Sequence, residues 1–259
     1  MILKHYIMRT LKDPLNFIML IAFPLAMVSI MVAAFNAELP ASVEYLLGGF
    51  NPSATGNLTF NAIFFLFFSG MIVTDYLYAE FRSDMRWRLM ATPKRFSSFV
   101  SAAIIASMIV TLINAVIVLT FGRFVLNAHL HNIFITGATV FVMAIFVTLF
   151  GVLIFLLVPK KSTCTAVMMA FAFIQMLPIQ FGILDIERGV IGIANFVPVV
   201  AAVQALQYSG TKVLNFEDGA VVGLFEPDMN RALIHLGIVV GYTVVLGIAV
   251  AVLGKVRKI

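Results

Sequence analysis

A charged stretch between two long apolar runs holds the side chains of this chain that are best suited to polar chemistry. It reads YAEFRSDMRWRLMATPKRF and covers residues 78–96. Only 11% of the chain is charged, yet seven ionised side chains gather here. Carboxylates and guanidinium groups at this density can contact a partner protein or anionic lipid headgroups. These side chains are Glu80, Arg82, Asp84, Arg86, Arg88, Lys94 and Arg95.

Local helix energetics do not explain this cluster. If residues 78–91 form a helix, Glu80 and Asp84 are a like-charge pair four positions apart. Arg82 and Arg86 are a second such pair. The one opposite pair at this spacing, Asp84 with Arg88, stabilises a helix by only about a few tenths of a kcal/mol. Two interpretations remain: a headgroup-binding loop that signals topology, and a cytosolic helix that docks on a partner.

Several kinds of site are missing from the sequence. The only Gly-Lys pair, Gly254-Lys255, lacks the remainder of a phosphate-binding loop. His129 and His131 lie two positions apart with no acid nearby, so we expect no metal site. We expect Asp75, near the inner end of a span, to have a structural role rather than to relay protons. The chain itself therefore predicts no catalytic residue and no bound cofactor.

The composition limits where such a chain can fold. Hydrophobic residues make up 62% of it, with 25 Phe and 14 Met, and the mean hydropathy is +1.06. A soluble domain of 259 residues cannot hide that much apolar surface. A single Cys excludes a disulfide framework. The basic residues are split among short segments, which indicates topology signals rather than a nucleic-acid surface.

The chain contains six stretches that can each supply the roughly 20 apolar residues of a membrane-crossing helix. We therefore predict an all-α integral membrane protein with a single transmembrane domain over residues 1–259. Apolar and basic side chains alternate at helical spacing over residues 1–13, which predicts an interfacial helix. The expected spans are residues 14–35, 58–78, 96–121, 133–158, 162–184 and 232–254.

The basic residues orient these spans. With the N-terminus inside, thirteen of the seventeen Lys and Arg residues lie in cytoplasmic segments and four lie outside. A seventh span over residues 189–211 would put the basic tail KVRKI outside. We therefore expect 189–211 to be a re-entrant or interfacial segment on the outer side, with both termini in the cytoplasm.

The charged stretch resembles the connection after the second span in permease subunits of type-2 ABC (ATP-binding cassette) exporters. That connection has an acid, a basic residue about two positions on, a Gly-Thr or similar pair, then Arg-Leu and Thr-Pro or similar. Asp84 and Met85 occupy the positions of the Gly and the hydroxyl residue. The matching residues are Glu80, Arg82, Arg88, Leu89, Thr92 and Pro93.

A second stretch supports the resemblance, which extends over nearly the whole chain. NFVPVVAAVQALQ, residues 195–207, is similar to the family's Asn-x-x-Pro…Ala-Leu-Arg segment, with Gln207 where Arg is common. The resemblance implies a half-transporter that pairs with a second copy or a similar permease. Each permease would dock on a separate ABC ATPase, which would bind ATP and Mg. Residues 79–92, Asp84 and Arg86 included, would form the coupling helix seated in that ATPase.

The expected cargo of this exporter is a hydrophobic or amphipathic molecule, such as a drug, a peptide or a lipid-like compound. Phe and Met side chains can line a path that adapts to varied shapes. An ion-coupled carrier and a non-transporting assembly factor remain the alternatives. We expect a multi-pass protein of a prokaryotic cell membrane that contacts lipids and no nucleic acid. The expected path residues are Phe64, Phe67, Phe68, Met71, Met168, Gln175 and Met176.

Overall fold

The chain folds as a bundle of long helices. The computed structural model describes residues 2–13, 18–36, 52–82, 96–128, 132–180, 197–210, 213–217, 220–225 and 228–256. In chain order the elements are α1 (Ile2–Lys12), the π-helical turn η1 (Ile18–Ala22), α3 (Phe23–Asn36), α5 (Pro52–Phe81), α7 (Phe96–Val125), α8 (Ile133–Leu157), α9 (Lys161–Gln180), α10 (Pro198–Gly210), β1 (Val213–Glu217), β2 (Ala220–Phe225) and α11 (Met229–Val256).

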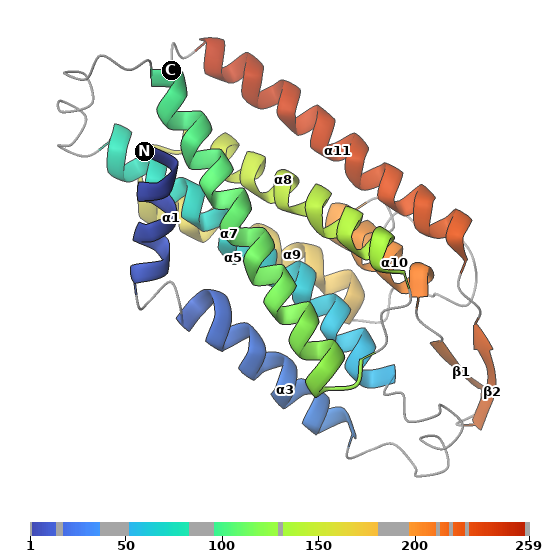
Figure 1. The fold of residues 1–259 in the computed structure, drawn as a ribbon. Coiled ribbons are helices and arrows are strands. Elements are labelled where there is room, and N and C mark those ends of the chain that lie inside the picture. The colour runs from blue at the N-terminus through green and yellow to red at the C-terminus, as the bar shows by residue number, and fades with distance from the viewer. Residues whose placement is uncertain are drawn as a thin grey trace.

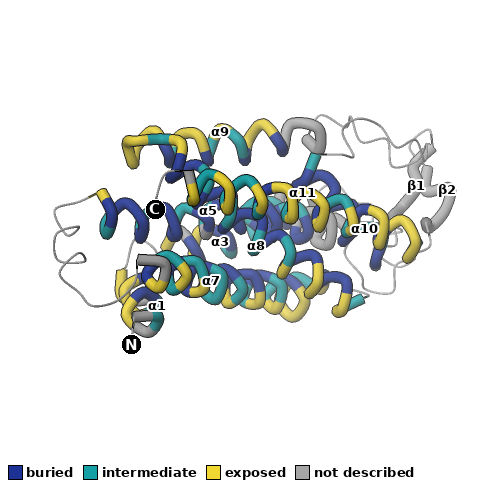
Figure 2. Tube along the Cα trace, turned by 90° about the horizontal axis from the view of Figure 1, so that it is seen from above, coloured by how far each residue is buried: buried dark blue, intermediate teal, exposed yellow. Residues whose placement is uncertain are grey.

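The centre of the bundle is α5, which contacts α3, α7, α8, α9 and α10. The neighbouring helix α8 packs against both α5 and α11, and α11 lies along one edge of the bundle (Figure 1). Most residues of α5 and α8 are buried, whereas few of α11 are. Figure 2 shows that exposed residues lie on the outward side of α9 and along α11. Lipid or another subunit can therefore cover those two faces.

Four helices are long and apolar enough to cross a membrane: Leu58–Phe81, Ser98–Val125, Ile133–Leu157 and Met229–Lys255. They coincide with four of the six expected spans. The expected first span falls on η1 and α3, of which Leu20–Ala33 is a shorter apolar helix. The expected fifth span falls on α9, and its last residues lie outside the described part of the chain. The count of six spans stays a prediction.

Local sequence explains where several helices begin. α5 and α10 both start at a proline, the residue that suits a first helical position because its missing N–H has no helical partner there. Asn132 precedes α8, and its side-chain oxygen accepts hydrogen bonds from the backbone N–H groups of Phe134 and Ile135, each 3.1 Å long. A helix is present over most of residues 1–13 as α1, and its place in the membrane interface stays a prediction.

The all-α prediction misses one small hairpin. β1 and β2 pair antiparallel, from Val213 opposite Phe225 to Glu217 opposite Ala220, with an irregularity at Asn215. Asp218-Gly219 between two apolar runs is a strong sequence signal for such a turn. In the preceding segment, residues 181–196 lie outside the described part, while α10 is a helix whose residues 198–206 are all buried. The re-entrant course of 189–211 stays a prediction.

Candidate functional site at the C-terminal end of α5

The last two turns of α5 hold a set of polar side chains that join this helix to three other elements. Asp75, Tyr76, Tyr78 and Glu80 lie on α5, and Arg82 follows its last residue. The expected coupling helix over residues 79–92 begins inside α5, which continues as a regular helix to Phe81. Any force on the chain after residue 82 therefore acts on the end of a 30-residue helix.

The first join connects α5 to α1 and is buried. The Tyr76 hydroxyl donates to the backbone oxygen of Tyr6 over 2.8 Å and hydrogen-bonds the Thr10 hydroxyl. The rings of Tyr6 and Tyr76 lie 4.7 Å apart between centroids. Tyr6, Thr10 and Tyr76 are each no more than 3% exposed. Because buried polar groups must find partners, this cluster fixes how α1 sits on α5.

Glu80 extends this join. The Tyr6 hydroxyl donates a hydrogen bond to the Glu80 carboxylate. Burial raises the pKa of the Tyr6 hydroxyl well above its usual value, and the hydrogen bond and charge of Glu80 raise it further. Tyr6 therefore remains a neutral donor across the physiological range. Atom Oε2 of Glu80 is buried and has no hydrogen-bond partner within the described ranges.

The second join connects Arg82 to the end of α8. One guanidinium nitrogen donates to the backbone oxygen of Phe155 over 2.8 Å, and another donates to that of Val158, which also accepts from the Tyr78 hydroxyl. The guanidinium carbon lies 5.0 Å from the centre of the Tyr78 ring and 4.8 Å from that of Phe155. A cation at these terminal carbonyls satisfies oxygens that a helix leaves unpaired and complements the negative end of the helix dipole.

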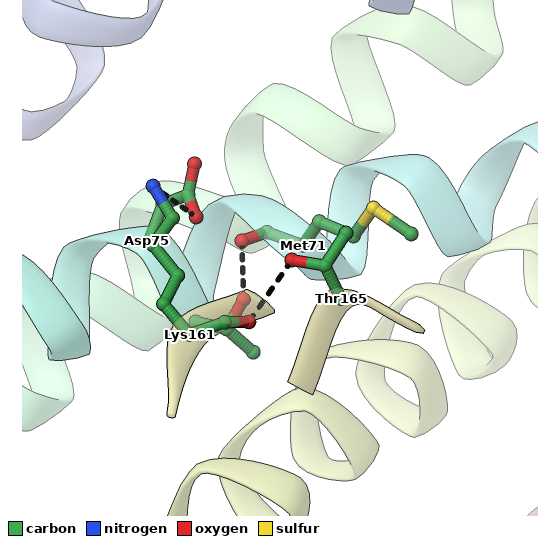
Figure 3. Close-up of polar contacts among 5 residues, drawn as sticks. Met71, Asp75, Lys161 and Thr165 are labelled. Atoms are coloured by element: carbon green, nitrogen blue, oxygen red, sulfur yellow. Dashed lines mark hydrogen bonds and ion pairs between the residues drawn. The ribbon is translucent and has the colours of Figure 1, made fainter. Parts of the chain in front are cut away.

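The third join is an ion pair between α5 and α9. Lys161 Nζ, at the first residue of α9, lies 3.0 Å from Asp75 Oδ1 (Figure 3). The two side chains are 58% and 41% exposed, so water screens the pair. Asp75 thus has a cationic partner at the end of the span. The pairing agrees with the structural role expected for it.

A polar hollow of about 450 Å³ lies beside these joins. Its wall includes residues of α1, α5 and the turn between α8 and α9. Water can therefore reach the ion pair and the guanidinium group from one side. The charged residues that line the hollow are Arg9, Asp13, Asp75, Arg82 and Lys161.

Comparison with known protein families places the chain in one of them. A family model described as ABC-2 family transporter protein matches residues 48–252, which is most of the chain. The chain belongs to the ABC-2 transporter family. It is thus a membrane subunit of an ABC transporter and a transport protein rather than an enzyme. No curated protein and no solved structure matches the chain.

The structure places two of the eight expected coupling residues of this ABC-2 permease, Glu80 and Arg82. Both bind other parts of the same chain. The remaining six lie outside the described residues: Asp84, Arg86, Arg88, Leu89, Thr92 and Pro93.

The expected path residues lie mainly where α5 meets α9. Phe64 contacts Phe173 with ring centroids 5.5 Å apart, and Phe67 contacts Phe171 at 6.0 Å. Phe67, Met168 and Gln175 are buried, and Phe64, Phe68 and Met71 are partly buried. The side chain of Met176 lies outside the described part. These residues thus form a packed helix interface in this structure, and their role in a path stays a prediction.

Sequence reasoning missed the partners that anchor the site. The helix over residues 1–13 was predicted to lie in the membrane interface, with no contact to Tyr76, yet Tyr6 and Thr10 both bind Tyr76. A polar residue at position 10, between the apolar side of α1 and its basic side, was the available signal. The backbone oxygens of Phe155 and Val158 have no signal in the sequence, because every residue carries such an oxygen.

Proposed function

We propose that this ABC-2 permease is the membrane subunit of an ATP-driven exporter coupled to a separate ABC ATPase. ATP and Mg would bind to that ATPase, and the permease would carry a hydrophobic or amphipathic molecule. The observation that carries the proposal is the triple join at the end of α5. It ties the residues directly before the charged stretch to α1, to the end of α8 and to the start of α9.

Through these joins, a movement of the ATPase could reach several helices of the permease at once. Residues 79–92 would seat in a cleft of the ATPase and contact it through Arg86, Arg88 and Leu89. Closure of the ATPases would push on the end of α5, and the joins would carry that push to α1, α8 and α9 together. The open acceptor Oε2 of Glu80 could take a donor from the moving segment.

The arrangement of helix ends supports the proposed topology. The end of α5, the start of α7, the end of α8 and the end of α11 lie at the same end of the bundle as α1, and β1 and β2 lie at the opposite end (Figure 1). We place the first end in the cytoplasm of a prokaryotic cell, because thirteen of seventeen basic residues belong there. The six-span count then needs α3 and α9 as the two further spans.

We place a second permease, identical or similar, against the exposed face of α9. Phe173 and Ile174 are 55% and 63% exposed there, next to the expected path residues of α5. Gln175 is only 4% exposed and is therefore a poor site for a crosslink between copies. A cysteine at Ile174 should form a disulfide between copies in membranes. If only monomer forms while export continues, the seam is elsewhere.

Copurification tests the proposed function. The tagged permease, expressed with its neighbouring genes, should bring down an untagged ABC ATPase in detergent. Vesicles that hold both should move an amphipathic dye only when ATP is present. Transport driven by an ion gradient without ATP would instead show a secondary carrier. Purification of the permease alone, with no transport of any kind, would favour an assembly factor.

A further inference from the structure

A second hollow, of about 560 Å³, lies between α8, α9, α10 and α11 and differs from the charged one in its lining. All its lining residues are uncharged, and most are apolar. Phe146, Phe150 and Phe171 form one wall of stacked rings, with centroids 6.3 Å and 4.2 Å apart in succession. The volume is within the range of small-molecule sites, and the lining suits a hydrocarbon chain.

A buried amide side chain also lines this pocket. Gln175 lines it and is 4% exposed. Its Oε1 accepts from the backbone N–H of Val199 over 3.2 Å, so the amide caps the first turn of α10, which starts at Pro198. Its Nε2 is buried and has no hydrogen-bond partner in the described part of the chain. A buried donor without an acceptor is costly, and the N-terminal end of α10 adds positive potential beside it.

The pocket opens at an exposed face of α11. Val245 lines it and is 66% exposed, and Tyr242 lines it and is 39% exposed. Both lie on α11, one of the four helices able to cross a bilayer, and α11 has few buried residues. A molecule that diffuses within the bilayer could therefore enter between α11 and α9 without passing through water.

We propose that this pocket binds one chain of an acyl-ester amphiphile. The hydrocarbon would lie along the three Phe rings, and the ester carbonyl oxygen would accept a hydrogen bond from Gln175 Nε2. The acceptor would be neutral, because none of the described residues that line the pocket is basic and could balance a negative charge. A charged headgroup would remain outside, at the membrane surface. Binding needs only the permease, so it can be tested separately from ATP-driven export.

Photolabelling of the purified full-length permease in lipid nanodiscs tests the proposal. The probes are a diacyl phospholipid, a single-chain fatty acid methyl ester and an alkane of equal length, each with a diazirine at the same chain position. Ala249→Phe fills the pocket, whereas Ile248→Phe changes the neighbouring residue, which is exposed and does not line it. We expect ester labelling on α8 and α11 to fall at least fivefold in Ala249→Phe and to persist in Ile248→Phe. Equal labelling of the two variants would overturn the site.

The donor is tested by the preference for ester over alkane. Wild type should favour the ester by about fivefold, the effect of one neutral hydrogen bond. Gln175→Leu should abolish that preference and keep alkane labelling, which also reports that the pocket is intact. An unchanged preference in Gln175→Leu would overturn the role of Nε2. Labelling by phospholipid alone identifies a resident lipid, and labelling by the single-chain ester identifies a mobile amphiphile.

Discussion

At the scale of single residues, the end of α5 combines contacts of very different strength. The Tyr76 hydroxyl is buried, and its hydrogen bond to the backbone oxygen of Tyr6 is made away from water. The ion pair of Asp75 with Lys161 is about half exposed, and water replaces it at little cost. Neutral hydroxyl groups therefore hold α1 in place more firmly than the charged pair holds α9.

This ranking predicts the outcome of two conservative substitutions. Tyr76→Phe should lower the free energy of unfolding by about 1–1.5 kcal/mol, because one buried hydrogen bond is lost while the Thr10 hydroxyl keeps the Tyr6 oxygen as its acceptor. Asp75→Asn should lower it by less than about 1 kcal/mol, since the pair is exposed. Thermal denaturation in one detergent measures both. A larger loss for Asp75→Asn would show that the ion pair dominates.

Arg82 offers a test of whether the joins transmit force. Arg82→Gln should keep insertion and copurification with the ATPase, yet reduce ATP-driven transport several-fold, because the end of α8 is released. Arg82→Lys should not restore transport, since an ammonium group has one nitrogen and cannot replace the two guanidinium nitrogens that donate to two separate carbonyl oxygens. Lys160→Gln, an exposed cation two residues beyond Val158, is the matched control and should transport normally. Normal transport by Arg82→Gln would mean that coupling bypasses α8.

At the scale of elements, the crossing of α5 and α8 depends on two glycines. A Cβ atom on Gly70 would lie 2.3 Å from Val147 Cγ1, and one on Gly151 would lie 2.7 Å from the backbone oxygen of Gly70. These contacts are too short for any side chain, so α5 and α8 touch backbone to backbone here. By contrast, Gly237 and Gly241, the GxxxG pair of α11, have no atom of the described structure within 4 Å of a Cβ.

Alanine substitutions should affect the stability of the protein differently at these two glycine pairs. Gly151→Ala should destabilise the protein by about 1–3 kcal/mol, because the neighbour at the added methyl group is backbone and cannot turn aside. Gly237→Ala should be neutral or stabilise by up to about 1 kcal/mol through helix propensity. Melting temperatures in the same detergent give the comparison. A stable Gly151→Ala variant would show that α5 and α8 can separate without loss.

The helices were predictable from the sequence, and the contacts between them were not. Apolar runs bounded by charges give the position of α7, α8 and α11 to within a few residues, because the bilayer fixes both length and composition. The same runs do not predict which glycines approach a neighbouring helix. Glu80 and Arg82 stand out in the sequence by their charge, but their partners on α1 and α8 depend on tertiary packing.

At the scale of the whole molecule, the proposal requires that the two ends of the bundle face opposite sides of the membrane. Cysteines at Ser83 and Asp218 report the two ends: in sealed right-side-out vesicles, an impermeant maleimide should label Asp218→Cys and spare Ser83→Cys. Permeabilised vesicles should expose both positions. Labelling of both from the same side would overturn the six-span topology.

The central claim is that residues 79–92 of this ABC-2 permease dock on a separate ATPase. Glu80 and Arg82 are unsuited to test it, because they also bind α1 and α8. Leu89 is the better position, since it belongs to the expected apolar stripe of the coupling helix. Leu89→Asp should insert and express normally but fail to retain the ATPase, because a buried charge without a partner costs roughly 2–5 kcal/mol at an interface.

The most direct measurement is a site-specific crosslink in native membranes. A photoreactive amino acid at position 89 should join the permease to a second polypeptide that carries a G-x-x-x-x-G-K-[ST] phosphate-binding loop, and mass spectrometry identifies it. We expect this adduct, and we expect it to be lost when ATPase expression is repressed. Adducts with lipid alone, while an ATPase still copurifies, would contradict the account and reduce the charged stretch to a topology signal.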